Sequence, residues 1–244
     1  VYQILRGVTF LERKVTKRAF TRSDCLTFNQ AEATATESGD HMNDLTTALL
    51  SAREEGEQLA GGTFARETAE GLDLSDLTFR RVRFDRCQFT GCDFSGAAFY
   101  ECVLDGCAFS GCRFAVSFWK DSALSGCKAE GGDFRKARFK GCTLDGLRLR
   151  YANFGAALWE RCSLTDCDLT ESGCQELKVA RTVFQDVNLT QADLFRSVLK
   201  GTDLSGCVLD GVTLSASCQE LRGAKIHASQ AAVVARILGI EVEG

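Results

Sequence analysis

Residues 89 to 114 read FTGCDFSGAAFYECVLDGCAFSGCRF, with a Phe or Leu at every fifth position and a Cys or Ala two residues before each. An α-helix has a hydrophobic period near 3.6 residues and a β-strand has one of 2, so neither element produces a period of five. The stretch therefore indicates a chain that turns a corner every five residues.

The period continues without a slip from Leu74 to Leu214 and covers 29 positions, with 11 Phe, 13 Leu and five other residues. The positions two residues earlier are mostly Cys or Ala, so two residues in every five point inward. The other three hold Asp, Arg, Lys, Ser, Thr and Gly and are expected to face water. Glycine is frequent two residues after the large apolar residue, where a tight corner favours a residue without Cβ.

Four such corners close a square, and identical squares stack as a parallel solenoid with about 4.8 Å between coils. Residues 20 apart then lie above one another, which places Trp119, Phe139 and Trp159 in one column. The repeat makes about seven coils and a rod of roughly 35 Å. The complete absence of proline fits this fold, because nearly every backbone N–H is needed for a hydrogen bond.

The places where the period holds and fails predict four segments. Residues 1–28 form a first coil in another register, and residues 29–71 are an acidic, partly helical insertion. Residues 72–218 form the repeat solenoid, and residues 219–244 form a last coil and a helix.

The insertion is predicted to contain a helix over residues 43–59, and residues 26–71 hold nine acids and two bases. Excursions from a rigid scaffold often carry function, so we expect the insertion to bind a partner and its removal to leave the fold intact. The alternative is a merely tolerated loop. The expected contact residues are Asp44, Leu45, Leu49, Arg53, Glu54, Glu55 and Glu57.

The C-terminal segment predicts a helix over residues 231–238, with Ser229 as its N-cap and Gly239 beyond its end. It either covers the open end of the solenoid or forms a two-fold dimer interface, and the surplus of apolar residues favours the interface. The expected interface residues are Ile226, Val233, Val234, Ile237, Leu238, Ile240 and Val242.

Ten of the 13 cysteines occupy the small inward position, which favours core packing over a metal or redox site. Scattered cysteines without a charged-then-apolar leader favour a reducing cytoplasm, and no apolar run is long enough to span a bilayer. No nucleophile elbow, phosphate loop or paired carboxylates are present, and a filled solenoid offers no pocket. We therefore expect no enzyme and no cofactor.

One set of acidic and amide residues recurs at intervals of 20 or 40 and is expected to line one face. These side chains either bond to the local backbone in turns or imitate the phosphates of DNA. Residues 73–216 hold 19 acids and 18 bases, so that any mimicry belongs to one face rather than to the whole rod. The residues of this set are Asp73, Asp93, Asp133, Asn153 and Asp193.

The repeat resembles the pentapeptide-repeat family, whose consensus is A-(D/N)-L-x-x. The triplets ANF at 152–154 and ADL at 192–194 match it outright, and GDF, CDL and TDL are near matches. The resemblance implies an all-β fold, a right-handed quadrilateral parallel β-helix.

Within that family, CKAEGGDFRKARF (127–139), YANFGAALWERCSL (151–164) and the tail LRGAKIHASQAAVVARILGIEVEG (221–244) resemble the Qnr and MfpA proteins. This implies a cytoplasmic homodimer that binds DNA gyrase or topoisomerase IV, as a DNA mimic, and protects it from fluoroquinolones or natural-product poisons. Direct contact with nucleic acid or a membrane is not expected.

The chain departs from Qnr proteins because no loop interrupts residues 74–214, so no gyrase contact is carried over residue by residue. The alternative function is a non-enzymatic scaffold that docks another protein.

Overall fold

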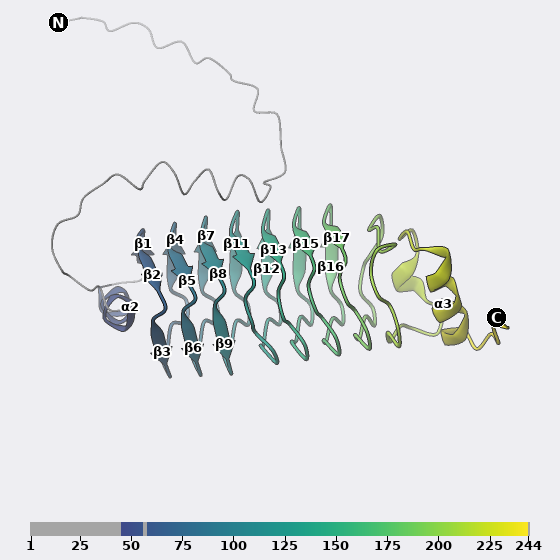
Figure 1. Ribbon diagram of the computed structural model, residues 1–244, viewed down its shortest axis with the longest axis horizontal. Coiled ribbons are helices and arrows are strands. Elements are labelled where there is room, and N and C mark those ends of the chain that lie inside the picture. The colour runs from purple at the N-terminus through teal and green to yellow at the C-terminus, as the bar shows by residue number, and fades with distance from the viewer. Residues whose placement is uncertain (1–44, 56–57, 244) are drawn as a thin grey trace, which may run out of the picture. The chain divides into compact units, whose positions relative to one another are not determined.

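The computed structural model describes residues 45–55 and 58–243, and it consists of stacked coils with one helix at each end (Figure 1). Helix α2 (Leu45–Glu54) precedes the first coil and helix α3 (Ala231–Ile237) follows the last. All pairs of strands are parallel, which confirms the predicted β-solenoid. The expected first coil over residues 1–28 lies outside the described residues.

The strands are three residues long and occupy three of the four sides of the coil. Sheet A consists of β1 (Gln58–Ala60), β4 (Thr78–Arg80), β7 (Ala98–Tyr100), β10 (Phe118–Lys120), β12 (Arg138–Lys140), β14 (Leu158–Glu160) and β16 (Lys178–Ala180). Sheet B consists of β2 (Thr63–Ala65), β5 (Arg83–Asp85), β8 (Val103–Asp105), β11 (Ala123–Ser125), β13 (Thr143–Asp145), β15 (Ser163–Thr165) and β17 (Val183–Gln185). Sheet C consists of β3 (Thr68–Glu70), β6 (Gln88–Thr90) and β9 (Ala108–Ser110), and single bridges from Asp73 onward form the fourth side.

The register of 20 residues places like residues in columns. Trp119 pairs with Phe139 and Phe139 with Trp159, as predicted. On the fourth side, rings of successive coils stack with centroids 4.8–4.9 Å apart and planes within 9° of parallel. That distance matches the spacing of hydrogen-bonded strands, so that ring stacking and backbone pairing share one period. The stacked rings belong to Phe94, Phe114, Phe134 and Phe154.

The corners confirm why glycine recurs two residues after the large apolar position. Gly96 has φ of 71°, and a Cβ at this residue would lie 2.1 Å from Oδ1 of Asp76 in the previous coil. Polar residues adopt the same left-handed conformation at other corners, for example Arg81 with φ of 54°. The corner therefore dictates the left-handed backbone conformation that favours glycine, and at Gly96 a larger residue would also require the Asp76 carboxylate to move.

The solenoid begins earlier than the sequence pattern predicted. The helix expected over residues 43–59 ends at Glu54, and β1, β2 and β3 build a coil from Gln58, ahead of the predicted start at residue 72. Leu59, Phe64 and Ala69 continue the five-residue step backward from Leu74. The prediction was wrong because a helical pattern was extended over Leu59, so this coil was assigned to the insertion.

Helix α2 covers the open end of that first coil. Leu45 and Leu49 are fully buried, and Thr46 Oγ1 donates to the carbonyl of Thr68 at 3.2 Å. Arg53 donates to the carbonyl of Ser75 at 2.6 Å and forms an ion pair with Asp73 at 3.2 Å. A helix and a coil thus occupy residues 45–55 and 58–70, so their removal is expected to expose the end of the solenoid instead of leaving the fold intact.

The register breaks after Leu214, as predicted. A short 3₁₀ helix, η1 (Gln219–Leu221), intervenes, and Lys225 then pairs with Asp203 at a separation of 22 residues instead of 20. A second 3₁₀ turn, η2 (Ala228–Gln230), leads into α3. His227 rather than Ser229 caps this turn, because its Nδ1 accepts from the backbone N–H of Ser229 at 3.2 Å.

Candidate partner-binding surfaces

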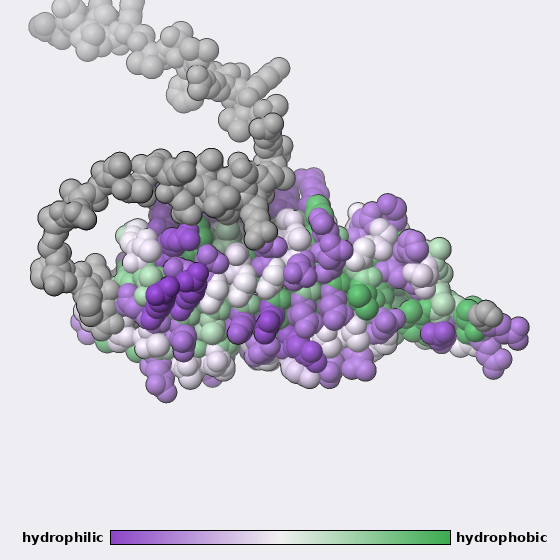
Figure 2. Space-filling model, viewed as in Figure 1, coloured by the Kyte–Doolittle hydropathy of each residue, from purple (hydrophilic) through white to green (hydrophobic). Residues whose placement is uncertain are grey.

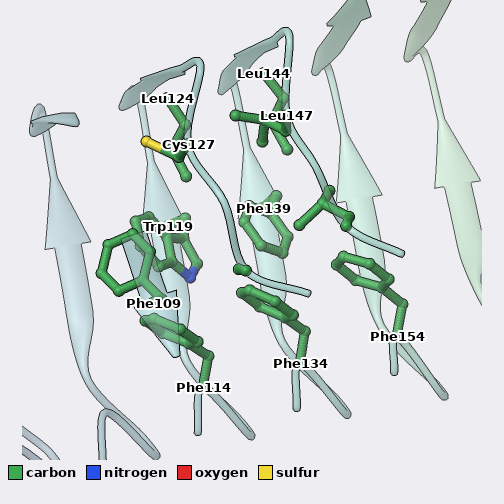
Figure 3. Close-up of a pocket in the computed structure, with 12 residues that line it drawn as sticks. Phe109, Phe114, Trp119, Leu124, Cys127, Phe134, Phe139, Leu144, Leu147 and Phe154 are labelled. Carbon is green, nitrogen blue, oxygen red and sulfur yellow. The ribbon is translucent and has the colours of Figure 1, made fainter. Parts of the chain in front are cut away.

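The interior of the solenoid is filled and apolar. The cavity there has a volume of about 20 Å³, and its lining consists of aromatic and aliphatic side chains with one cysteine (Figure 3). It lies beside Ala129, the one alanine among the 29 large inward positions from Leu74 to Leu214. A cavity of this size admits one water and contains no ionisable group suited to acid–base chemistry.

The cysteines of the described chain are all buried and free. Several thiols donate to a carbonyl of the preceding coil, for example Cys107 Sγ to Phe84 at 3.4 Å. Burial raises the pKa of Cys167 to about 11 and that of Cys174 to about 12, so that both thiols stay neutral at physiological pH. Within residues 45–55 and 58–243, no three His, Cys, Asp or Glu side chains group in a way that could hold a metal ion.

The predicted column of acids lies along the fourth side, where its residues bridge to their neighbours in successive coils. Each of these side chains also accepts from the backbone N–H two residues later. Asp133 Oδ1 accepts from Arg135 at 3.1 Å and Asn153 Oδ1 from Gly155 at 2.9 Å. The column therefore performs the turn chemistry that was one of the two interpretations. The other bonds of this type belong to Asp73, Asp93 and Asp193.

Basic residues neutralise much of this column. Arg113 occupies one position within it and forms an ion pair with Asp93 at 2.9 Å. Arg135 pairs with Asp133 at 2.7 Å, and its guanidinium holds the pKa of that carboxyl below its ordinary value. Arg53 forms an ion pair with Asp73, so that three of the four aspartates in this column have a basic partner. The fourth side thus presents alternating charges rather than a row of free carboxylates.

A row of acids with fewer basic partners lies on sheet B. The outward residues from Val103 to Asp186 on this side include four aspartates and no Lys or Arg. Arg83 approaches the first of them at 3.8 Å, and no basic partner contacts the other three among the described residues. We call this surface the acidic face, and it consists of Asp105, Asp145, Asp166 and Asp186.

The acidic face does not appear as one column of equivalent residues, because two of its aspartates directly follow the large inward residue and the other two lie one position later. Sorting every outward residue by its side of the 20-residue coil separates the four sides from sequence alone. This sorting requires the register of the five-residue repeat, which the unbroken series from Leu74 to Leu214 provides.

The residues predicted for contact in the insertion lie in different environments. Leu45 and Leu49 face the core and cannot serve as partner contacts, which corrects that expectation. Arg53 donates to the carbonyl of Ser75 and pairs with Asp73, whereas Glu54 and Glu55 are exposed. Asp44 and Glu57 lie outside the described residues.

The predicted dimer residues divide into two sets. Ile226, Val234 and Ile237 pack against the solenoid core, and Val233 is partly buried. The exposed set forms a hydrophobic region at the C-terminal end of the rod (Figure 2). Its members are Leu238, Ile240 and Val242, which are 47%, 55% and 42% exposed. The segment therefore covers the end of the solenoid and also presents an apolar surface.

The sequence matches models of pentapeptide repeats over most of the solenoid. One, described as a pentapeptide repeat region, matches residues 78–154, and another, for eight copies of the repeat, matches residues 148–186 and 178–211. Together with the parallel coils, these matches show that the chain belongs to the pentapeptide-repeat family. No curated protein sequence matches it significantly.

Solved pentapeptide-repeat structures are similar to this chain at low identity. A trypsin-treated form of QnrB1, a plasmid-mediated fluoroquinolone resistance protein, is 22% identical, with 75% of this chain and 100% of that chain covered and a TM-score of 0.38. HetL, a protein involved in heterocyst differentiation regulation in the cyanobacterium Nostoc, is 15% identical, with 76% and 95% covered and a TM-score of 0.31. A protein of the Arabidopsis thaliana thylakoid lumen is 21% identical, with 58% and 77% covered and a TM-score of 0.20.

Neither α-helix of the described residues, with ten and seven residues, has the length and apolar character needed to cross a bilayer.

Proposed function

We propose that this chain is a non-enzymatic protein of the cytoplasm that binds DNA gyrase and/or topoisomerase IV and protects it from fluoroquinolones or a natural-product poison. The observation that supports the proposal is the acidic face, with four aspartates on one side of a straight row of coils. These enzymes bind DNA in basic grooves, and a regular row of carboxylates is the protein surface that suits such a groove.

The spacing of the acidic face is comparable with that of one DNA strand. Its four charges extend over four coil spacings, about 19 Å, so their mean separation is roughly 6 Å. One strand of duplex DNA carries one charge per about 3.4 Å. The face is therefore a weaker polyanion than DNA, and its encounter with a basic groove should weaken as salt rises.

The test is a supercoiling and cleavage assay with purified enzyme, a quinolone and several natural poisons. We expect the wild type to restore supercoiling with at least one poison, and Asp145→Lys/Asp186→Lys to lose this rescue. Glu130→Lys/Glu171→Lys is the matched control, because these acids occupy the same repeat positions on the sheet C side. Absence of rescue with every poison would contradict the proposed function.

We also propose a homodimer joined at residues 221–244, supported by the exposed apolar set. Leu238→Asp/Ile240→Asp should produce a folded monomer in sedimentation experiments. Val183→Asp/Val208→Asp, which changes exposed valines elsewhere on the rod, should leave the dimer intact. A wild type that already sediments as a monomer would exclude the dimer.

A scaffold that docks an unrelated protein is the second candidate, favoured by the absence of a projecting loop between Gln58 and Leu214. A pull-down that recovers neither gyrase nor topoisomerase IV subunits, together with no rescue in the supercoiling assay, would favour it.

A further inference from the structure

The outward side of sheet A from β12 onward is strongly basic. Six bases and one acid, Glu160, lie there on four successive coils. We call this surface the basic face, and its bases are Arg138, Lys140, Arg161, Lys178, Arg181 and Lys200.

The strand register brings these residues together. Arg138 pairs with Leu158 and Leu158 with Lys178, so two bases lie two coils apart in one column. Arg161 and Arg181 occupy the next corner in consecutive coils, both with positive φ. At about 4.8 Å per coil, the six bases occupy a strip roughly 15–20 Å long.

The single acid does not neutralise this strip. The carboxylate of Glu160 is shared between Lys140 at 4.0 Å and Arg161 at 3.6 Å. The other four bases have no acidic partner among the described residues. The strip thus keeps an excess of five positive charges on a chain whose net charge is −4.

We propose that the basic face binds the phosphate backbone of a nucleic-acid duplex. Closely spaced cations repel one another, and a polyanion relieves this repulsion while releasing its own condensed counterions. Binding of this kind does not require a large apolar contact area. It therefore suits a short strip whose outward residues are mostly charged.

An acidic protein is the competing partner, and the apolar residues of the strip argue against it. A protein interface needs an apolar centre that contact with the partner can bury. Two apolar residues lie between the bases: Leu158 is already half-buried, and Ala180 is exposed but offers only a methyl group. The exposed Val198 lies at the end of the strip. The proposal departs from the expectation of no direct nucleic-acid contact, which accompanied the resemblance to the Qnr and MfpA proteins.

The experiment measures fluorescence anisotropy of a labelled duplex of 24 base pairs with the full chain between 50 and 200 mM salt. Four or five phosphate contacts predict a slope of log affinity against log salt near −4, or roughly a 250-fold loss of affinity over this range. The test variant is Arg138→Glu/Lys178→Glu. The matched control is Arg148→Glu/Lys128→Glu, with the same residue types at the same repeat position on the sheet C side.

We expect the test variant to lose at least about tenfold in affinity and to reduce the slope by about two, as two lost phosphate contacts require. The control should change affinity by less than threefold, and circular dichroism should show both variants folded. Equal losses in both variants, no binding at 50 mM salt, or equally effective competition by polyglutamate would each overturn the proposal. None of these measurements contains a topoisomerase, so their outcome is independent of the proposed function.

Discussion

The side chain of Glu220 replaces the backbone carbonyl groups that a further coil would provide as hydrogen-bond acceptors. In regular coils the corner N–H donates to the carbonyl 19 residues later, as Glu176 does to Phe195 at 2.9 Å. At the end of the rod, Arg196 N–H donates instead to Oε1 of Glu220 at 2.9 Å, and Ser215 N–H donates to Oε2 at 3.2 Å. Glu220 is only 2% exposed, so a buried carboxylate accepts from backbone N–H groups where no further coil exists.

Glu220→Gln should lower the free energy of unfolding by about 1–2 kcal/mol at pH 7, because one strong acceptor becomes a donor. The measurement is urea denaturation monitored by circular dichroism. Glu171→Gln, an exposed acid at a corner, is the matched control and should change stability by less than about 0.5 kcal/mol.

The effect of Glu220→Gln should also depend on pH. Burial alone would raise the pKa of Glu220, but hydrogen bonds from the backbone N–H groups of Glu220, Arg196 and Ser215 hold it below the ordinary 4.5. A lowered pKa in the folded state means that the carboxylate stabilises the fold above pH 4.5, and that this contribution disappears as pH falls through the folded-state pKa. The difference between wild type and variant should therefore shrink in acid. A constant difference from pH 7 to pH 3 would contradict this role.

At the scale of the coil, the residue type at one inward position, Ala129, decides whether the interior is completely packed. Phe109 stacks on Phe89 with centroids 5.1 Å apart, and Ala129 occupies the equivalent position one coil later. The ring column ends there and leaves the cavity of about 20 Å³ among residues of neighbouring coils (Figure 3). Empty apolar volume forfeits dispersion contacts and destabilises the fold.

Ala129→Val should raise the free energy of unfolding by about 0.5 kcal/mol, given about 24 cal/mol per Å³ of cavity removed. Thermal and urea unfolding measure this change. Ala97→Val is the matched control, because Ala97 is fully buried at a small inward position that the cavity does not reach. There the added methyl groups should overpack and destabilise by about 1–3 kcal/mol. Loss of stability in both variants would show that the space beside Ala129 cannot accept a larger side chain.

At the scale of the whole molecule, both ends of the described solenoid are covered. Helix α2 buries Leu45 and Leu49 at the first coil, and the C-terminal segment packs Val234 and Ile237 at the last. Uncovered coil ends expose unpaired backbone and apolar side chains, which favours association and fraying. We therefore infer that α2 stabilises the rod as a cap.

Leu49→Ala should reduce the free energy of unfolding by about 2–4 kcal/mol, because a buried leucine is truncated in a packed site. Leu50→Ala is the matched control, since it makes the same change in the same helix at a residue that is 46% exposed. The control should cost less than about 1 kcal/mol. Comparable small effects in both variants would mean that α2 does not cap the solenoid.

The sequence alone determined the period, the columns and the inward residues of this chain. Each five-residue repeat sees the same neighbours above and below, so Leu104, Leu124 and Leu144 align whatever the outward residues are. The same regularity predicted the break after Leu214, because a solenoid cannot tolerate a slip without a visible change of period.

Only the tertiary structure decided which outward charges are free and which residues close the ends. Asp93 and Asp193 occupy the same repeat position in the sequence, yet Arg113 of the next coil pairs with the first and no base pairs with the second among the described residues. Ion pairs and caps depend on side-chain reach across coils and on where the stack stops, and neither quantity repeats every five residues. For that reason the sequence assigns each charge to a side of the coil, whereas the ion pairing of those charges and the capping role of α2 appeared only when the coils were stacked.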